Sequence, residues 1–510
     1  MLVYGDRSET AEPEDRLAAI AGGLAAVRAM PAGLDRHSRL MAALIESGRL
    51  LQGVEDAGGP ERELGVFLRK LAGAAVRSWD SGFLTLGDLP FIHAISGLPS
   101  KVTLRVPEGF AYYAVYPEAY ADAARRLTLR APPRVIGIRS IGTTLGAIVA
   151  AALGAPPPVT VRPFGDPFAR QVHLSESVLE GDPHFVIVDE GPGLSGSSFG
   201  SVARWLEQHD VPLERIAFLP SHSGDPGGEA SGEDRERWTV AQKIAGEIDP
   251  QWLADRFGSL QRLHRGDQLK FLAGEGDGRL LLKFAGLGAM GEQKLKMARA
   301  LHSAGFGAEP IGLFHGFLAE RWYDAARSLE PGERPIGIIG DYIATRARLF
   351  PAQDASGASL DELAEMAKRN ISLTLGQETT ARVPVPPAVE LKRVRTDNRL
   401  DRDKWLRLDD GRLLKTDALD HHQSHDLVGC QNPAWDVAGA IVEFDLDREE
   451  AAQLLSRSGP LVDRDLIDFF TVAYASFRMG RAVLRSEESE GNRYRRHLQT
   501  RLVVAAKEQQ

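Results

Sequence analysis

The chain has 510 residues, enough for about three domains of usual size, with 43% hydrophobic and 26% charged residues, which is an ordinary globular composition. Its 61 basic and 70 acidic side chains give a net charge of −9, so the basic excess of a general nucleic-acid binder is missing. Cys430 is the only cysteine, which excludes an intrachain disulfide and a cysteine-based zinc cluster and favours a reducing compartment.

No segment favours membrane insertion or export. The longest small and apolar stretch, 145–155, is much shorter than the roughly 20 residues that span a bilayer. The acidic N-terminus lacks the basic-then-apolar order of a signal peptide. We therefore expect a cytoplasmic protein whose partners are small molecules, with no membrane or nucleic acid, and we leave a homo-oligomer open.

The first part of the sequence is helical. Apolar residues such as Leu17, Ile20 and Leu24 recur at helical spacing, which predicts a helical N-terminal region over 1–80. Short apolar strands then alternate with helices, which predicts an α/β fold with a doubly wound parallel sheet in a domain of residues 81–222. Its strands are expected at 134–138, 159–162, 184–188 and 215–219, and its helices at 143–153 and 198–208.

A change in composition separates this domain from the rest. Residues 222–237 are rich in Gly and charge, so we expect a linker over 223–257 and a further domain over 258–510. The patterns in that domain predict a mixture of strands and helices. Strands are expected in 258–284, 311–321, 404–408 and 412–417, and helices in 291–304, 335–376, 434–444 and 464–484.

The most informative stretch is 184–206. Its apolar strand ends in two adjacent carboxylates, Asp189 and Glu190, which can accept hydrogen bonds from neighbouring ribose hydroxyls or hold a metal that does so. A turn rich in Gly and Ser then leads into a helix, whose first backbone N–H groups and serine hydroxyls can bind an anion. The residues expected to cradle a phosphate are Leu194, Ser195, Gly196, Ser197 and Ser198.

This stretch resembles the signature of the type I phosphoribosyltransferases, in which an apolar strand and two acidic residues precede Thr-Gly-x-Thr and a helix. The resemblance covers about 95–222, and the spacer here is one residue longer than in the family. It implies phosphoribosyl pyrophosphate as substrate, used with Mg²⁺. Asp189 and Glu190 would hold the ribose, and residues 194–198 would hold its 5-phosphate.

Two features upstream fit the same family. Arg139 opens a loop between a strand and a helix, as the family's pyrophosphate loop does, and would face the diphosphate as the glycosidic bond breaks. Residues 161–173 stand where the family has its mobile lid. By that resemblance, Arg162, Arg170 and His173 are further anion contacts.

The domain over 258–510 carries a lysine, Lys283, inside the apolar strand 280–284. Burying a charge without a partner is costly, so this lysine needs a carboxylate or a phosphate. Glu292, early in the next helix, is the ion-pair partner that we expect.

Together with that strand, two later segments resemble the aminoglycoside and choline phosphotransferases, over about 260–485. They are 394–403, in the place of the catalytic loop, and 432–438, which is similar to the family's Asp-Pro-Ala-Trp-Asp-Leu-Ala. The resemblance implies a two-lobed α+β kinase-like domain that binds ATP through Lys283 and Glu292.

The same resemblance assigns roles within the catalytic loop. Asp397 matches the aspartate that orients the acceptor hydroxyl, and Asp417 matches the second metal-binding aspartate. Arg402 stands where the family has an asparagine, so Asp403 would supply that ligand to Mg²⁺.

Two further motifs offer alternatives. Residues 286–291 are a literal Gly-x-Gly-x-x-Gly between a strand and a helix, as in a Rossmann dinucleotide site. Residues 420–426 include three histidines and two aspartates, enough for a transition metal, or they form a polar loop near the nucleotide.

The leading hypothesis is a bifunctional transferase. It would combine phosphoribosyl transfer with ATP-dependent phosphorylation of a small-molecule hydroxyl. The alternatives are a sensor that binds phosphoribosyl pyrophosphate or a nucleotide without turnover, because the long spacer and Arg402 depart from the families, and a C-terminal Rossmann oxidoreductase.

Overall fold

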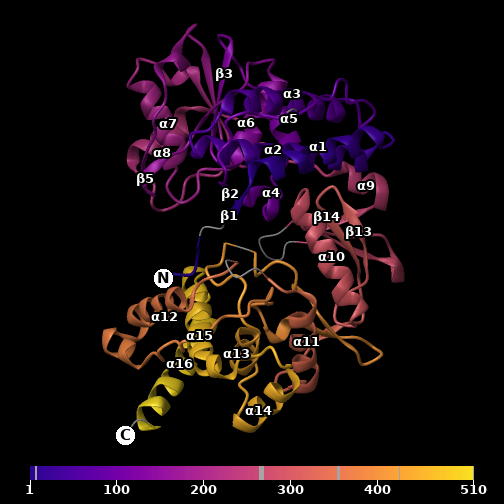
Figure 1. Ribbon diagram of the computed structural model, residues 1–510, viewed down its shortest axis with the longest axis vertical. Coiled ribbons are helices and arrows are strands. Elements are labelled where there is room, and N and C mark those ends of the chain that lie inside the picture. The colour runs from indigo at the N-terminus through magenta and orange to yellow at the C-terminus, as the bar shows by residue number, and fades with distance from the viewer. Residues whose placement is uncertain (6–7, 93, 264–268, 353–355, 424, 509–510) are drawn as a thin grey trace.

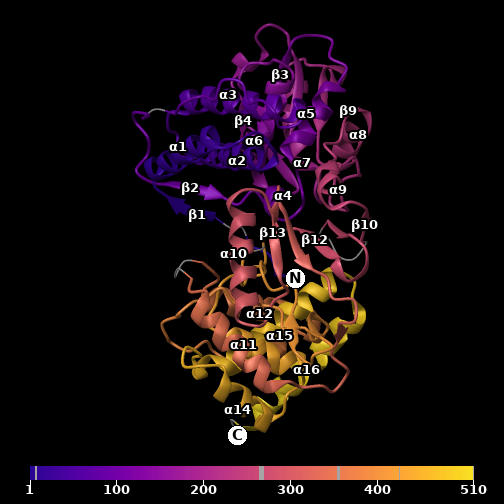
Figure 2. The same cartoon turned by 90° about the vertical axis from the view of Figure 1, so that its right-hand side faces the viewer.

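The computed structural model describes residues 1–508 except 6–7, 93, 264–268, 353–355 and 424. Figure 1 shows a parallel sheet with helices in the upper part, an antiparallel sheet at the right and a helical part below. Figure 2, turned by 90°, shows the antiparallel sheet and its helix between the upper and lower parts. No helix among the described residues is long and apolar enough to cross a membrane.

The predicted parallel sheet is confirmed. Its strand order is β4-β3-β7-β8-β9, so the order of the chain reverses between β3 and β7. Helix α6 and the N-terminal helices cover one face and α7 and α8 the other, as a doubly wound sheet requires. The strands are β3 (Pro133–Ile138), β4 (Val159–Val161), β7 (His184–Val188), β8 (Ile216–Leu219) and β9 (Gln242–Lys243), and the helices α6 (Ile141–Ala152), α7 (Ser197–Glu207) and α8 (Gly232–Val240).

The predicted N-terminal helices are also confirmed, and they belong to the core of the parallel sheet. Leu44, Leu68 and Leu145, from three different helices, are fully buried in one hydrophobic cluster that also contains Val186 of β7. The helices are α1 (Pro13–Ala29), α2 (Leu34–Asp56) and α3 (Glu61–Asp80). Strand β1 (Ser8–Ala11), before these helices, pairs antiparallel with β2 (Val102–Arg105), after them, and β2 is followed by α4 (Glu108–Ala111) and α5 (Pro117–Arg125).

The expected linker over 223–257 is wrong for much of its length. It contains α8, the edge strand β9 and helix α9 (Gln251–Phe257). Trp238 of α8 is 2% exposed and packs against Phe199 and Phe218 on the sheet. The Gly- and charge-rich composition conceals this contact, because one buried tryptophan supplies most of the apolar surface that the helix needs.

The antiparallel strands predicted in 258–284 are confirmed within a five-stranded sheet of order β10-β11-β12-β14-β13. This antiparallel topology rules out the Rossmann alternative. Gly286 instead allows close packing: a Cβ there would lie 3.0 Å from the carbonyl oxygen of Ala111 in α4. The elements are β10 (Leu260–Arg262), β11 (Lys270–Ala273), β12 (Leu280–Phe284), α10 (Ala289–Ser303), β13 (Pro310–Phe314) and β14 (Phe317–Arg321).

The rest of the chain forms a mainly helical lobe, so the expected two-lobed α+β arrangement is confirmed. The N-terminal end of the chain reaches this lobe, because Val3 is buried against α15 and the backbone N–H of Leu2 donates to Asn370 of α12. The elements are β15 (Arg327–Ser328), α11 (Ile336–Leu349), α12 (Leu360–Leu375), β16 (Trp405–Arg407), β17 (Leu413–Lys415), α13 (Ala434–Glu443), α14 (Arg448–Arg457), α15 (Ile467–Leu484) and α16 (Glu488–Glu508).

Candidate functional site

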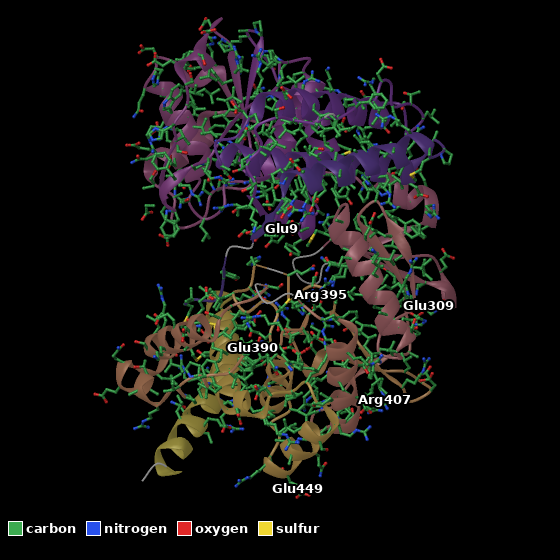
Figure 3. The ribbon with its side chains drawn as sticks, in the orientation of Figure 1. Glu9, Glu309, Glu390, Arg395, Arg407 and Glu449 are labelled. Atoms are coloured by element: carbon green, nitrogen blue, oxygen red, sulfur yellow. The ribbon has the colours of Figure 1, made fainter. Side chains whose placement is uncertain are left out.

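A cavity of about 740 Å³ lies between the antiparallel sheet and the helical lobe. In Figure 3, Arg395 lies where the upper and lower parts of the molecule meet, two residues before Asp397. The charged side chains that line the cavity are Lys270, Lys283, Glu320, Arg321, Asp324, Arg399, Lys404, Lys415, Asp417, Asp420, Asp426, Arg481 and Arg485.

Lys283 of β12 forms an ion pair with Asp417, which follows β17, at 2.8 Å. Burial alone would raise the pKa of Asp417, but Lys283 and His421 outweigh it and hold that pKa well below its usual range. The expected pair of Lys283 with Glu292 is wrong, since Glu292 pairs with Arg39 of α2 on the surface. The choice between two nearby carboxylates depends on tertiary packing, which the sequence pattern does not contain.

Asp417 belongs to a cluster with Asp420 and His421. Ligand atoms of these three residues all lie within 4.8 Å of one another, so they can hold a cation. Nζ of Lys294 in α10 lies 3.0 Å from Asp420 in a buried second ion pair. Asp403, the other expected metal ligand, is not part of the cluster: its side chain is 67% exposed and pairs with Lys404.

The histidines of 420–426 do not come together as one metal site. His421 joins the cluster above, whereas His422 is buried with no hydrogen-bond partner among the described residues for either ring nitrogen. His425 packs against Tyr4 with the two rings tilted, and its Nδ1 lies 3.1 Å from the hydroxyl of Tyr113.

Asp397 is fully buried and lies behind the wall of the cavity. One of its oxygens accepts a hydrogen bond from the hydroxyl of Tyr342 at 2.5 Å. The same oxygen forms an ion pair with Lys415 at 3.1 Å. Its other oxygen lies 3.5 Å from Nδ1 of His421. Lys415 and His421 outweigh burial and lower the pKa of this carboxyl, so it is ionised but screened from the cavity.

The loop around Asp397 is fixed by two groups. Asp436, in the predicted run 432–438, accepts hydrogen bonds from the backbone N–H groups of Asp397 and Asn398 at 2.8 and 2.9 Å. Arg346 of α11 donates to the carbonyls of Arg395 and Thr396, at 2.7 and 3.2 Å. The sequence analysis missed Arg346, which is fully buried. An arginine beside Ile343 and Ala347 on an apolar helix face was the signal that could have found it.

A second site lies at the carboxyl ends of β3 and β7, where the strand order reverses, which is where open α/β sheets bind ligands. Asp189 and Glu190 stand there together. Burial raises the pKa of Asp189 to about 7, and burial with repulsion from Asp189 raises the pKa of Glu190 to about 8. Nearby positive charge does not offset the effect of burial on these two adjacent carboxyls. They therefore fit a ligand that brings hydroxyls or a cation.

The expected phosphate loop follows this pair and leads into α7. Gly196 takes a left-handed backbone (φ 68°) just before the helix. The hydroxyl of Ser197 donates to the carbonyl of Pro167 at 2.8 Å, in the turn between β5 (Phe164–Asp166) and β6 (Ala169–Gln171). Ser195 donates to Ser197 at 2.9 Å, and the side chain of Leu194 is 66% exposed. Ser195 and Ser197 thus lie between the acidic pair and α7, with their hydroxyls bonded to each other and to this hairpin.

Two of the three arginines expected to contact anions already have carboxylate partners. Arg139 and Arg162 both pair with Asp56, at the end of α2, at 3.1 and 2.5 Å. Glu55 lies 3.7 Å from Arg139. Sequence reasoning missed these carboxylates, because nothing in the pattern of α2 indicates that its end reaches the sheet. The other two expected contacts are His173, which stacks on Phe164, and Arg170, whose charge acts on Asp189.

Helix α4 connects the two sites. At one end, the backbone N–H of Gly109 donates to the carboxylate of Glu190 at 3.1 Å. At the other, the carbonyl of Ala111 accepts from Lys294 at 3.3 Å, while Tyr112 and Tyr113 line the cavity. The first half of the chain therefore forms part of the cavity wall.

No known protein family and no curated protein matches the chain. Among solved structures, the choline kinase LicA of Streptococcus pneumoniae is 16% identical, covers 50% of this chain and 97% of its own, and gives a TM-score of 0.35. An ethanolamine kinase of Plasmodium vivax is 11% identical, covers 51% and 84%, and gives 0.33. A spectinomycin phosphotransferase, solved with ADP and spectinomycin, is 11% identical, covers 49% and 94%, and gives 0.34. At these identities and scores, function has to be argued from the site itself.

Proposed function

We propose that the C-terminal half transfers the γ-phosphoryl group of ATP to a hydroxyl of a small molecule. The observation that carries this proposal is the pair of Lys283 and Asp417 at the wall of the cavity, beside the second pair of Lys294 and Asp420. Phosphoryl transfer depends mainly on positioning and on neutralising phosphate charge. Lysines and carboxylates in one cavity supply both.

The donor set of the cluster fits Mg²⁺. Mg²⁺ prefers oxygen ligands and usually keeps several waters, so Asp417 and Asp420 would hold it, with His421 beside them. When bound, Mg²⁺ would screen the charge of the phosphates. Lys283, next to Asp417, would then face the same phosphates.

In the transfer, the acceptor oxygen bonds to the γ-phosphorus, the bond to ADP breaks and the hydroxyl proton is released. Asp397 is screened from this reaction by His421, so its role as the group that orients the acceptor requires the imidazole to turn away. While the imidazole stays in place, Asp397 fixes His421 and Lys415 at the cavity wall.

The test is calorimetry with ATP and Mg²⁺, paired with an assay of phosphoryl transfer. Lys283→Met and Asp417→Asn should lose ATP binding, because both groups would contact the phosphates or their metal. Asp397→Asn should keep ATP affinity and slow transfer by about 10²-fold or more. Arg412→Gln, an exposed charge that pairs with Asp410, is the control. ATP binding that all four variants share with the parent would contradict the proposal, as would a parent that binds no ATP.

A second candidate function belongs to the crevice between β3 and β7: transfer of a phosphoribosyl group from phosphoribosyl pyrophosphate. The observation that favours it is the acidic pair beside Ser195–Ser197 at the reversal of the strand order. Asp189→Asn with Glu190→Gln should weaken binding of this compound about 30-fold or more, through loss of charge-assisted hydrogen bonds. Binding without release of diphosphate in the presence of bases would indicate the sensor instead.

A further inference from the structure

We propose that the acceptor of this phosphotransferase carries a phosphate group of its own, held by Arg399 and Arg481. The inference rests on the proposed function of the same cavity and names the class of its substrate. A phosphorylated sugar with a free hydroxyl is the simplest compound that fits.

The first support is a group of arginines that lines the cavity. Arg399, from the loop after Asp397, Arg481 of α15 and Arg485, the C-cap residue just after that helix, all line it. The backbone N–H of Arg485 donates to the carbonyl of Arg481, four residues earlier, and so caps the helix. Three guanidinium groups therefore line the same cavity, and the charges of Arg399 and Arg485 both act on Arg481.

The second support is the charge balance at Arg399 and Arg481. Asp426 forms an ion pair with Arg481 at 2.6 Å. Within the described part of the chain, Arg399 has no ion pair or hydrogen bond, although it is half-buried. Burial and the charge of Arg399 together lower the pKa of Arg481 to about 10. Cations that destabilise one another in a cavity fit an anionic ligand.

The third support is the nature of the anion. Arginine presents a planar fork of donors that matches the oxygens of a phosphate or carboxylate. A phosphate dianion offers more oxygens and more charge to Arg399 and Arg481 than a single carboxylate does. The aromatic side chains of Tyr112 and Tyr113 line the same cavity and can pack on the apolar face of a sugar.

This assignment is consistent with the reaction. The acceptor's hydroxyl oxygen bonds to the γ-phosphorus of ATP, the bond to ADP breaks, the proton is released, and the product carries two phosphoryl groups. A phosphorylated sugar is also the class of compound that we propose for the crevice beside Glu190, which Gly109 connects to this cavity.

The experiment is calorimetry of the full-length protein with ribose 5-phosphate, ribose, ribonate and choline. Ribose 5-phosphate should bind at a site that ribose and choline do not occupy, and more tightly than ribonate. Arg399→Gln should weaken this site by about tenfold or more, and Arg399→Lys by less. Replacing Arg399 leaves no carboxylate of the described residues without its partner, so we expect the variant to fold. Arg412→Gln, at an exposed ion pair, is the control.

Two outcomes would overturn the inference. One is an equal affinity for ribose and ribose 5-phosphate, or a preference for choline. The other is ribose 5-phosphate binding that Arg399→Gln leaves unchanged, which would assign all of it to the loop at Ser195–Ser197. A failure of the proposed function can be told apart, because ATP binding tests that function. Lys283→Met should lose ATP binding and keep the Arg399-dependent binding of ribose 5-phosphate.

Discussion

His37 of α2 and His315, in the turn between β13 and β14, both place Nε2 2.8 Å from the same oxygen of Glu118. Their other ring nitrogens bond to Ser78 and Ser38, at 2.9 and 3.0 Å. All three side chains of this triad are buried. The triad therefore connects the N-terminal helices to the antiparallel sheet through one carboxylate.

Glu118→Gln should lower the free energy of unfolding at pH 7 by about 2 kcal/mol or more, since hydrogen bonds to a buried charge are lost. The two histidines outweigh burial and lower the pKa of Glu118 below its usual value near 4.5. This stabilisation is present above pH 4.5 and is lost as the pH falls through the lowered pKa, so the difference from the parent should shrink in acid. Chemical denaturation from pH 3 to 8 measures it. Glu309→Gln, which breaks an exposed pair with Arg321, should cost much less.

The acidic pair should give a pH dependence of opposite sign. The pKa values of Asp189 and Glu190 are raised to about 7 and 8, so the folded protein holds protons that the unfolded chain has released. The free energy of unfolding of the ligand-free protein should therefore fall as the pH rises from about 4.5 to 8. Asp189→Asn with Glu190→Gln should flatten this part of the curve, in denaturant titrations over that range. An unchanged curve would mean that both carboxyls titrate normally.

Trp238→Ala should destabilise the parallel sheet by about 3–5 kcal/mol, because a large side chain in a packed core is removed. Trp205, on the outer side of α7, is only half-buried and stacks on His209. Trp205→Ala should cost clearly less. If thermal unfolding gives similar losses for both variants, α8 is not an integral layer of the sheet.

Asp436→Ala should cost about 3 kcal/mol, since two buried backbone N–H groups lose their acceptor. The loop at Asp397 and Asn398 should loosen, with faster hydrogen exchange at those two amides. Asp410→Ala, at an exposed turn, is the comparison and should change stability by a few tenths of a kcal/mol at most. Unaltered exchange at Asp397 in the Asp436 variant would contradict the assigned role.

Local patterns were sufficient for most of the secondary structure. The apolar run at 184–188 and its neighbours predicted a parallel sheet, because strands buried on both faces read as continuous apolar segments. The helices over 1–80 were equally clear from their spacing. The same patterns failed at 223–257, where α8 and β9 are short and depend on Trp238 rather than on a repeated apolar face.

The candidate site was predictable only as a set of residue types. The conspicuous Lys283 and Asp417 do meet, but the partner expected for Lys283 was a residue nearby in sequence, whereas the actual one is more than a hundred residues away. Partners of this kind follow from chain topology. For the same reason the sequence did not indicate that Asp56 would form an ion pair with Arg139, or that His421 would lie between Asp397 and the cavity.

The hydrophobic cluster around Leu44 and Leu145 continues without interruption into the antiparallel sheet, through Phe284 and Phe317. Helices α12, α13 and α15 build a different cluster around Trp435. Cooperative unfolding follows such clusters rather than the order of motifs along the chain. The strand that carries Lys283 is thus tied to the stability of the parallel sheet, and Asp417 to that of the helical lobe. Their ion pair joins these two parts across the cavity, so the cavity is intact only while both remain folded.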